Sequence, residues 1–271
     1  MKLQMSDGTN LIVEVNEGEQ PIRGQVLIVH GLAEYKERYN HLVKFLNENN
    51  YRTIRYDQRG HGDSEGERVY FNERDTLFKD LYEVVQFINK DKLDAPLFIL
   101  GHSMGGFTVA GFAVEHPNMV DGLILSGAMT YNSSGKLKPI PKWVPGKIKI
   151  PGNFAGLQAH KISHDLEIVT NYKNDPKVIK HVTVGLVRGF YKGVEVIKEK
   201  CSKFNDPVLI LHGSDDLLVS VEDSKWLYNN ISSNDKDIKI YDGLYHEILN
   251  EIQKEQVMED ILEWLNLRTT V

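Results

Sequence analysis

The sequence predicts an α/β protein with a mostly parallel central sheet, flanking helices and one inserted cap. Three observations predict this fold class. Short apolar runs recur along the chain, segments with helical periodicity lie between them, and the alternation breaks between residues 131 and 203. Alternating strands and helices favour a parallel sheet that is covered on both faces. A length of 271 residues suits one large domain, or one domain that carries an insertion.

Several apolar runs are expected to form buried strands, because a strand covered on both faces is apolar almost throughout. At the N-terminus, residues 2–5 and 11–15 flank Asp7-Gly8-Thr9, which indicates an antiparallel hairpin at the edge of the sheet. The buried runs are residues 25–29, 53–56, 97–100, 122–125 and 208–211, with residues 238–241 as a weaker sixth.

Helices are expected between these strands. Residues 39–47, 76–88 and 257–265 carry apolar side chains at helical spacing, which is typical of a helix with one buried face. Residues 106–115 form a further apolar stretch that is compatible with a helix.

The inserted cap is predicted where the alternation stops. Residues 131–203 contain five prolines, many glycines and an amphipathic patch at residues 183–197. We therefore expect a core made of residues 1–130 and 204–271, with residues 131–203 inserted between two strands of the main sheet.

Composition and charge exclude several classes of protein. Hydrophobic residues make up 41% and charged residues 26%, ordinary values for a globular protein. The net charge of −6 gives no reason to expect nucleic acid or an anionic membrane as a partner. Cys201 is the single cysteine, and the ten histidines are scattered, so we expect neither a disulfide nor a metal. No signal peptide or membrane span is recognisable, and a cytoplasmic location is expected.

The strongest motif is Gly101-His102-Ser103-Met104-Gly105, which directly follows the apolar run at residues 97–100. It fits the G-x-S-x-G pattern of a nucleophile elbow, and a helix-compatible stretch comes straight after it. This motif requires such a strand, turn and helix. Ser103 is therefore the candidate nucleophile.

A serine hydroxyl needs a neighbouring base, and behind this kind of elbow an acid and then a histidine follow in the chain. Asp215 and Asp216 both follow the run at residues 208–211, and the turn pattern Gly-x-x-Asp favours Asp216. His246 follows the last predicted strand. We expect His246 to accept the proton of Ser103 while Asp216 orients its imidazole ring.

The negative oxygen of a tetrahedral intermediate needs hydrogen-bond donors. The expected donors are the backbone N–H groups of Met104, next to the nucleophile, and of Leu32, in the loop at residues 30–34. A third block, residues 56–68, is rich in glycine and charge. Its side chains, which include Asp57, Arg59 and His61, are interpreted as braces for a tight loop rather than as catalytic groups.

At these residues the chain resembles the monoacylglycerol lipase and lysophospholipase group of α/β-hydrolases. Gly-His-Gly-x-Ser-Glu-Gly, from Gly60 to Gly66, is specific to this group when it occurs with Gly-His-Ser-Met-Gly-Gly, from Gly101 to Gly106. The resemblance covers both halves of the core in order and is weaker through the cap. Further matches lie at residues 30–34 with 38–39, 213–216 and 245–247.

The resemblance implies an α/β-hydrolase fold and cofactor-free hydrolysis of a carboxylic ester with a long acyl chain and a small polar alcohol. The favoured substrates are monoacylglycerols. Lysophospholipids, general carboxylic esters and thioesters are the alternatives, and a non-catalytic binding module is a remote one. Epoxide hydrolases and dehalogenases have an aspartate in place of Ser103, and the loop at residues 30–34 lacks the His-Gly-Gly-Pro-Gly pattern of proline iminopeptidases.

The resemblance also suggests substrate-binding residues. Glu34 and Arg38 fall near the polar end of the family's pocket, where they either touch the alcohol or stabilise the loop. Leu249 replaces the second histidine of the mammalian enzymes, so glycerol recognition is expected to differ. An exposed apolar rim of the cap would allow transient contact with membranes or lipid aggregates. The cap residues expected to line a lipid tunnel include Trp143, Ile150, Phe154, Leu186 and Phe190.

Overall fold

The computed structural model describes residues 1–71, 73–91, 93–151 and 159–269. Among these residues, eight strands form one sheet in the order β1-β2-β4-β3-β5-β6-β9-β10. Every neighbouring pair from β4 to β10 is parallel, whereas β1 pairs with β2, and β2 with β4, in antiparallel fashion. The strands are β1 (Lys2–Gln4), β2 (Asn10–Asn16), β3 (Gly24–Val29), β4 (Tyr51–Tyr56), β5 (Leu97–His102), β6 (Gly122–Ser126), β9 (Val208–Gly213) and β10 (Lys236–Tyr241).

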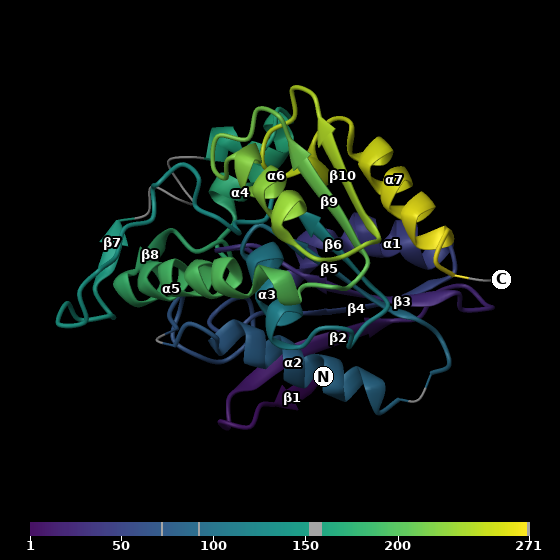
Figure 1. Cartoon of the computed structure of the whole chain (residues 1–271), viewed down its shortest axis with the longest axis horizontal. Coiled ribbons are helices and arrows are strands. Elements are labelled where there is room, and N and C mark those ends of the chain that lie inside the picture. Colours follow the sequence, from purple (N-terminus) through teal and green to yellow (C-terminus); the bar gives the residue numbers. More distant parts are fainter. Residues whose placement is uncertain (72, 92, 152–158, 270–271) are drawn as a thin grey trace.

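Helices cover both faces of this sheet (Figure 1). Val26 and Ile28 of β3 pack with α1 and α7, whereas Leu27 and Val29 belong to the core on the opposite face, with α2 and α3. Both faces of β3 are therefore buried, which explains its uninterrupted apolar run. The core helices are α1 (Asn40–Glu48), α2 (Thr76–Asn89), α3 (Met104–Glu115), α6 (Val221–Asn230) and α7 (Lys254–Asn266), with short 3-10 helices at Lys36–Tyr39, Cys201–Lys203 and Ile248–Asn250.

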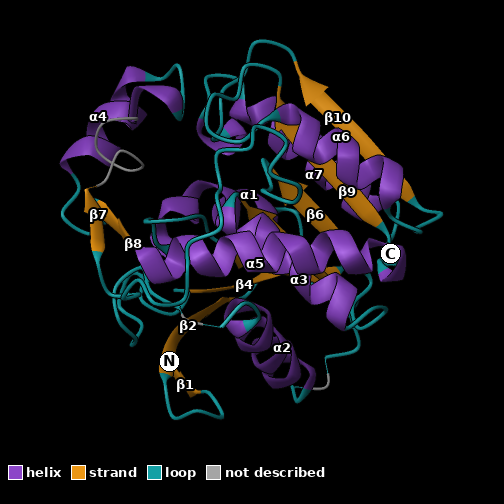
Figure 2. Cartoon of the chain, turned by 60° about the vertical axis from the view of Figure 1, so that its left-hand side comes forward, coloured by secondary structure: helices purple, strands orange, loops and turns teal. Residues whose placement is uncertain are grey.

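The segment between β6 and β9 adds elements beyond one end of the main sheet and one long helix that runs across α3 (Figure 2). Its strands β7 (Lys149–Pro151) and β8 (His181–Thr183) pair in antiparallel fashion. Its helices are α4 (Leu166–Asn174), α5 (Val184–Lys200) and a 3-10 helix at Ala159–Lys161. The T-shaped contact between Phe190 of α5 and Phe107 of α3, with ring centroids 5.0 Å apart, joins α5 to the main core.

The predicted fold class is confirmed. All six apolar runs form strands, and the N-terminal hairpin is the antiparallel pair of β1 and β2. Helix α6 was not expected, because its buried residues are Asp223, Ser224 and Leu227 and leave little apolar periodicity. Asp223 accepts hydrogen bonds from backbone N–H groups of residues 131–133. No helix in the described parts of the chain is long and apolar enough to span a membrane.

Candidate active site

Ser103 lies in a sharp turn between β5 and α3. Its backbone has φ 52° and ψ −111°, in the left-handed half of conformational space that non-glycine residues rarely adopt. The turn depends on close backbone contacts: a Cβ added to Gly105 would lie 1.9 Å from the carbonyl oxygen of Val29, and one added to Gly101 would lie 2.5 Å from that of Gly105. Any side chain at these two positions would clash with the backbone, so both must be glycine.

Three polar side chains meet at the carboxyl ends of parallel strands. His246, in the loop after β10, has its Nε2 2.8 Å from Ser103 Oγ. Its Nδ1 lies 2.6 Å from Oδ2 of Asp216, which follows β9. The exposed Asp215 instead accepts a hydrogen bond from the hydroxyl of Ser214. Of the two acids considered from the sequence, Asp216 is therefore the one that contacts the histidine.

Asp216 is held by its loop as well as by His246. Its Oδ1 accepts hydrogen bonds from the backbone N–H groups of Leu218, at 2.8 Å, and Val219, at 2.9 Å. His212 Nε2 lies 3.1 Å from the other oxygen. Burial opposes ionisation, but the two histidines outweigh it and hold the pKa of Asp216 well below its usual range. The carboxylate is therefore charged and fixed in place.

The electrostatic surroundings favour a proton on His246. Burial lowers the pKa of this imidazole, but Asp216, Glu247 and Glu34 together raise it above the ordinary value. His102, whose ring centroid lies 4.8 Å from that of His246, has the opposite shift. Burial and the nearby His246 lower the pKa of His102 to about 4, so His102 is neutral at pH 7. The neighbouring ring thus adds no charge that would oppose an imidazolium.

The predicted oxyanion donors both belong to residues that line the pocket beside Ser103. Within the described parts of the chain, neither Leu32 N–H nor Met104 N–H donates to a protein acceptor. The loop containing Leu32 is shaped by Ala33, which has φ 67°, and by Glu34, whose carboxylate accepts the N–H of Gly31. The role of the two donors stays a prediction.

A buried charge cluster lies at the polar end of the pocket. The guanidinium of Arg38 makes two 2.7 Å hydrogen bonds to the carboxylate of Glu247 and one of 2.6 Å to Glu34. Tyr39 donates its hydroxyl to Glu34 at 2.8 Å, and the guanidinium lies 4.6 Å from the ring centroid of Tyr172. Two carboxylates share one guanidinium, so the charged groups of this cluster sum to −1.

Arg38 and Glu247 stay ionised despite their burial. Burial raises the pKa of Glu247, but the charge and hydrogen bonds of Arg38 outweigh it and bring the value to about 2. Glu247 was not predicted as a site residue, although it adjoins His246 in a motif that carries the family resemblance. Its partner Arg38 lies 209 positions earlier, and the sequence contains no local pattern that joins the two.

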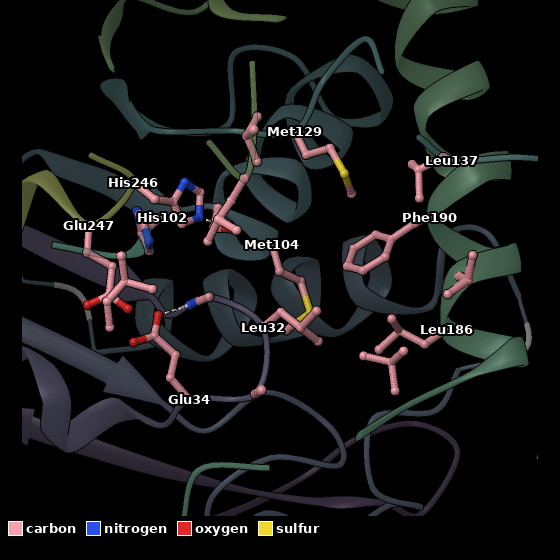
Figure 3. Close-up of a pocket in the computed structure, with 18 of the residues that line it drawn as sticks. Leu32, Glu34, His102, Met104, Met129, Leu137, Leu186, Phe190, His246 and Glu247 are labelled. Atoms are coloured by element: carbon pink, nitrogen blue, oxygen red, sulfur yellow. Dashed lines mark hydrogen bonds between the residues drawn. The ribbon is translucent and has the colours of Figure 1, made fainter. Parts of the chain in front are cut away.

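The pocket around Ser103 has a polar end and an apolar end, as Figure 3 shows. Its empty space is about 830 Å³, which includes space open to solvent. His102, His246, Glu34 and Glu247 form the polar end. The apolar end consists mainly of side chains from the elbow, from the cap and from the loops between them, among them Leu32, Met104, Met129, Leu137, Leu186 and Phe190.

Several predicted substrate-binding residues lie elsewhere. Among the described residues, Glu34, Leu186 and Phe190 line the pocket, whereas Arg38, Trp143 and Ile150 do not. Arg38 is engaged by Glu34 and Glu247. The prediction for Trp143 is wrong, because its side chain is 83% exposed, and Ile150 packs against the main hydrophobic core. Phe154 lies outside the described residues, and Leu249, which differs from the mammalian histidine, is buried in the core rather than at the pocket.

The block at residues 56–68 contacts the core instead of the pocket. Asp57 accepts hydrogen bonds from the backbone N–H and the ammonium group of Lys36, and from the N–H of Asp63. Arg59 forms two hydrogen bonds with the carboxylate of Asp80. These contacts agree with the structural role inferred from the sequence.

Comparison with known proteins now identifies the family. Residues 20–253 match the sequence pattern of the protein family described as serine aminopeptidase, S33. The chain belongs to this family.

Relatives place the chain in the monoacylglycerol lipase group of the α/β-hydrolase superfamily. It is 29% identical to a monoacylglycerol lipase of Mycolicibacterium smegmatis, over 95% of this chain and 93% of the relative. It is 28% identical to the phospholipase YtpA of Bacillus subtilis, over 86% and 92%. The crystal structure of the Paleococcus ferrophilus monoacylglycerol lipase superposes with a TM-score of 0.83 at 26% identity, over 95% of this chain and 99% of that one.

Proposed function

We propose that the protein is a serine hydrolase that cleaves carboxylic esters of lipids, with monoacylglycerols as its preferred substrates. The observation that carries this proposal is the position of Ser103, hydrogen-bonded to His246, in a pocket with one apolar and one polar end. The apolar end suits an acyl chain, and the polar end suits a small alcohol. The monoacylglycerol lipases among the relatives support the same substrate class.

The contacts of Ser103 and His246 support catalysis in two half-reactions. As Ser103 Oγ bonds to the ester carbonyl carbon, His246 Nε2 takes the hydroxyl proton and Asp216 stabilises the imidazolium. The N–H groups of Leu32 and Met104 would hold the oxyanion, each contributing about 10²- to 10³-fold in rate. When the C–O bond to the alcohol breaks, His246 returns the proton to the leaving oxygen. A water molecule then hydrolyses the acyl-enzyme by the same steps.

The charge cluster supports a neutral headgroup. Glu34 and Glu247 line the polar end, and Arg38 offsets one of their two charges. A phosphate group there would meet a like charge, whereas the hydroxyl groups of glycerol can donate hydrogen bonds to carboxylate oxygens. A lysophospholipase is the second candidate, because the Bacillus subtilis relative is a phospholipase.

The decisive experiment compares monoacylglycerols and lysophospholipids at matched acyl length, with esters from two to eighteen carbons alongside. We expect the highest kcat/KM for long-chain monoacylglycerols, and loss of activity in Ser103→Ala without loss of the folded state. Ser202→Ala, at an exposed serine, is the matched control. Full activity in Ser103→Ala would refute the assignment of the nucleophile. A sharp optimum at acetyl esters would refute the lipid substrate.

A fluorophosphonate probe separates the enzyme from a non-catalytic binding module. The probe reacts with activated serines, so we expect labelling of the wild-type protein and none of Ser103→Ala. Absence of labelling in the folded wild-type protein would favour the binding module.

A further inference from the structure

Charge is unevenly distributed along the chain. Between residues 122 and 164 the sequence has six lysines and no aspartate or glutamate, although the whole chain has 38 acidic and 32 basic residues. The remaining residues therefore contain 26 basic and 38 acidic side chains. Five of the six lysines fall within residues 136–149, which we call the lysine loop. The net charge of the whole chain, −6, does not reveal this basic segment. For that reason the net charge alone did not indicate an anionic membrane as a partner.

The lysine loop exposes apolar side chains together with its cations. Trp143 is 83% exposed and Ile148 is 47% exposed. All five lysines of the loop are exposed, and one of them, Lys147, forms an ion pair with Glu67 at 2.6 Å. Among the described residues, the other four lysines of the loop have no acidic partner within salt-bridge distance. Lys136 instead donates a hydrogen bond to the carbonyl oxygen of Leu217 at 3.1 Å.

The fold holds this loop in place. The buried guanidinium of Arg188, on α5, donates hydrogen bonds to the carbonyl oxygens of Val144 at 2.6 Å, Pro141 at 2.9 Å and Ile140 at 3.3 Å. In Figure 1 the loop leads into β7 at the left edge of the molecule, near the N-terminal end of α5. The hydrogen bonds of Arg188 thus fix the backbone on both sides of Trp143, whose side chain is exposed to solvent.

The same loop reaches the pocket. Leu137, between the exposed Lys136 and Lys138, lines the pocket together with Leu186 and Phe190 of α5. A lipid surface that contacts the lysine loop would therefore lie next to the apolar end of the pocket.

We propose that the lysine loop docks the protein on anionic phospholipid surfaces, with Trp143 entering the interface and the lysines pairing with lipid phosphates and carboxylates. Lysines beside an exposed tryptophan match such an interface, because the ring is amphipathic and the cations are attracted to the negative surface potential. A nucleic acid would use the lysines but would leave the exposed Ile148 without a partner. This docking goes beyond the proposed ester hydrolysis and does not depend on it.

The test measures binding to vesicles of phosphatidylcholine alone, and of phosphatidylcholine with about a third phosphatidylserine. All variants are made in the Ser103→Ala background so that no lipid is consumed. We expect binding to the anionic vesicles that weakens as salt rises. Each lysine near the surface contributes about fivefold, so Lys138→Gln/Lys142→Gln should lower the partition coefficient about 30-fold. Trp143→Ala should lower it about tenfold.

The matched control is Lys44→Gln/Lys79→Gln, which removes two exposed lysines from α1 and α2 and changes the net charge equally. It should bind anionic vesicles almost as the parent does. With Ser103 restored, both double variants should hydrolyse a water-soluble ester at the wild-type rate, which shows that they fold. Equal binding to the two vesicle types, equal loss in both double variants, or equally tight binding to duplex DNA would overturn the proposal.

Discussion

Removing the cation from the buried charge cluster should harm the protein far more than removing one of its anions. Arg38→Gln leaves the carboxylates of Glu34 and Glu247 buried side by side, and the charge of the cluster becomes −2. Glu247→Gln brings that charge to zero, because Arg38 keeps its 2.6 Å bond to Glu34. The two substitutions remove opposite ends of the same pair of 2.7 Å hydrogen bonds.

The expected magnitudes follow from what each variant leaves unpaired. Removing one partner of a buried ion pair costs about 3–5 kcal/mol, which is our expectation for the free energy of unfolding of Arg38→Gln. In Glu247→Gln, no charge is left alone, and the cost is about 1–3 kcal/mol for the weakened charge-assisted hydrogen bonds. The difference of about 2 kcal/mol is larger than the error of a well-measured urea titration.

Lowering the pH should narrow this difference. In the wild-type protein, Arg38 holds the pKa of Glu247 at about 2, so its stabilising contribution is complete above about 4.5 and is lost below that pH. In Arg38→Gln, burial and mutual repulsion raise the carboxylate pKa values, and one carboxylate regains a proton as the pH falls. From pH 7 to pH 5, Arg38→Gln should therefore recover stability relative to the wild type, whereas Glu247→Gln should not.

Urea unfolding of the three proteins at pH 7 and pH 5 measures both effects. Arg268→Gln is the matched control, because its partner Asp235 is half exposed and the loss should be within about 1 kcal/mol. The reasoning is refuted if Arg38→Gln is no less stable than Glu247→Gln at pH 7, or if lowering the pH does not reduce the gap.

Three further predictions concern catalysis. Asp216→Asn should lower kcat about 10⁴-fold, because Nδ1 of His246 loses its carboxylate, whereas steady-state kinetics of Asp215→Asn should match the wild type. His246 acts as a base in its unprotonated form, so its pKa sets the acid limb of the pH–rate profile. Burial lowers this pKa, but Asp216 and its neighbours raise it more, and the midpoint of the limb should therefore lie above the ordinary 6.5. A midpoint below 6.5 would contradict this. Phe190→Ala should reduce kcat/KM for long-chain esters more than for acetyl esters, and an unchanged acyl-length profile would remove Phe190 from the acyl site.

Ser103, His246 and Asp216 could be predicted because each one follows a strand and lies in a local pattern. The elbow needs a strand, two glycines and a helix within a few residues. Asp216 and His246 follow β9 and β10, and parallel strands bring their carboxyl ends to one edge of the sheet. Choosing between Asp215 and Asp216 was harder. The turn pattern favoured Asp216, and in the structure its backbone contacts with Leu218 and Val219 show why the turn presents that side chain.

Other features depend on contacts that have no local pattern. Arg38 and Glu247, which pair in the fold, are 209 positions apart in the sequence. Trp143 was expected to line a lipid tunnel, but Arg188 binds the carbonyl groups around it and the ring is exposed to solvent. The position of Arg188 beside these carbonyl groups depends on how the cap folds. The residue types next to Trp143 in the sequence do not predict it.

The two charged regions have opposite signs and would act on different parts of the lipid. The lysine loop would hold the protein at an anionic surface, while Glu34 and Glu247 would disfavour a phosphate at the reacting ester. An enzyme that bound such a surface through its catalytic pocket would be occupied by the surrounding phospholipids. Separating the cations from Ser103 avoids that competition, because the attraction acts on the lipid surface and the selection acts on the headgroup inside the pocket. Reversing the charge of the lysine loop should therefore change vesicle binding. It should not change the preference for monoacylglycerol over lysophospholipid in detergent solution. A shift in that preference would show that the two regions are not independent.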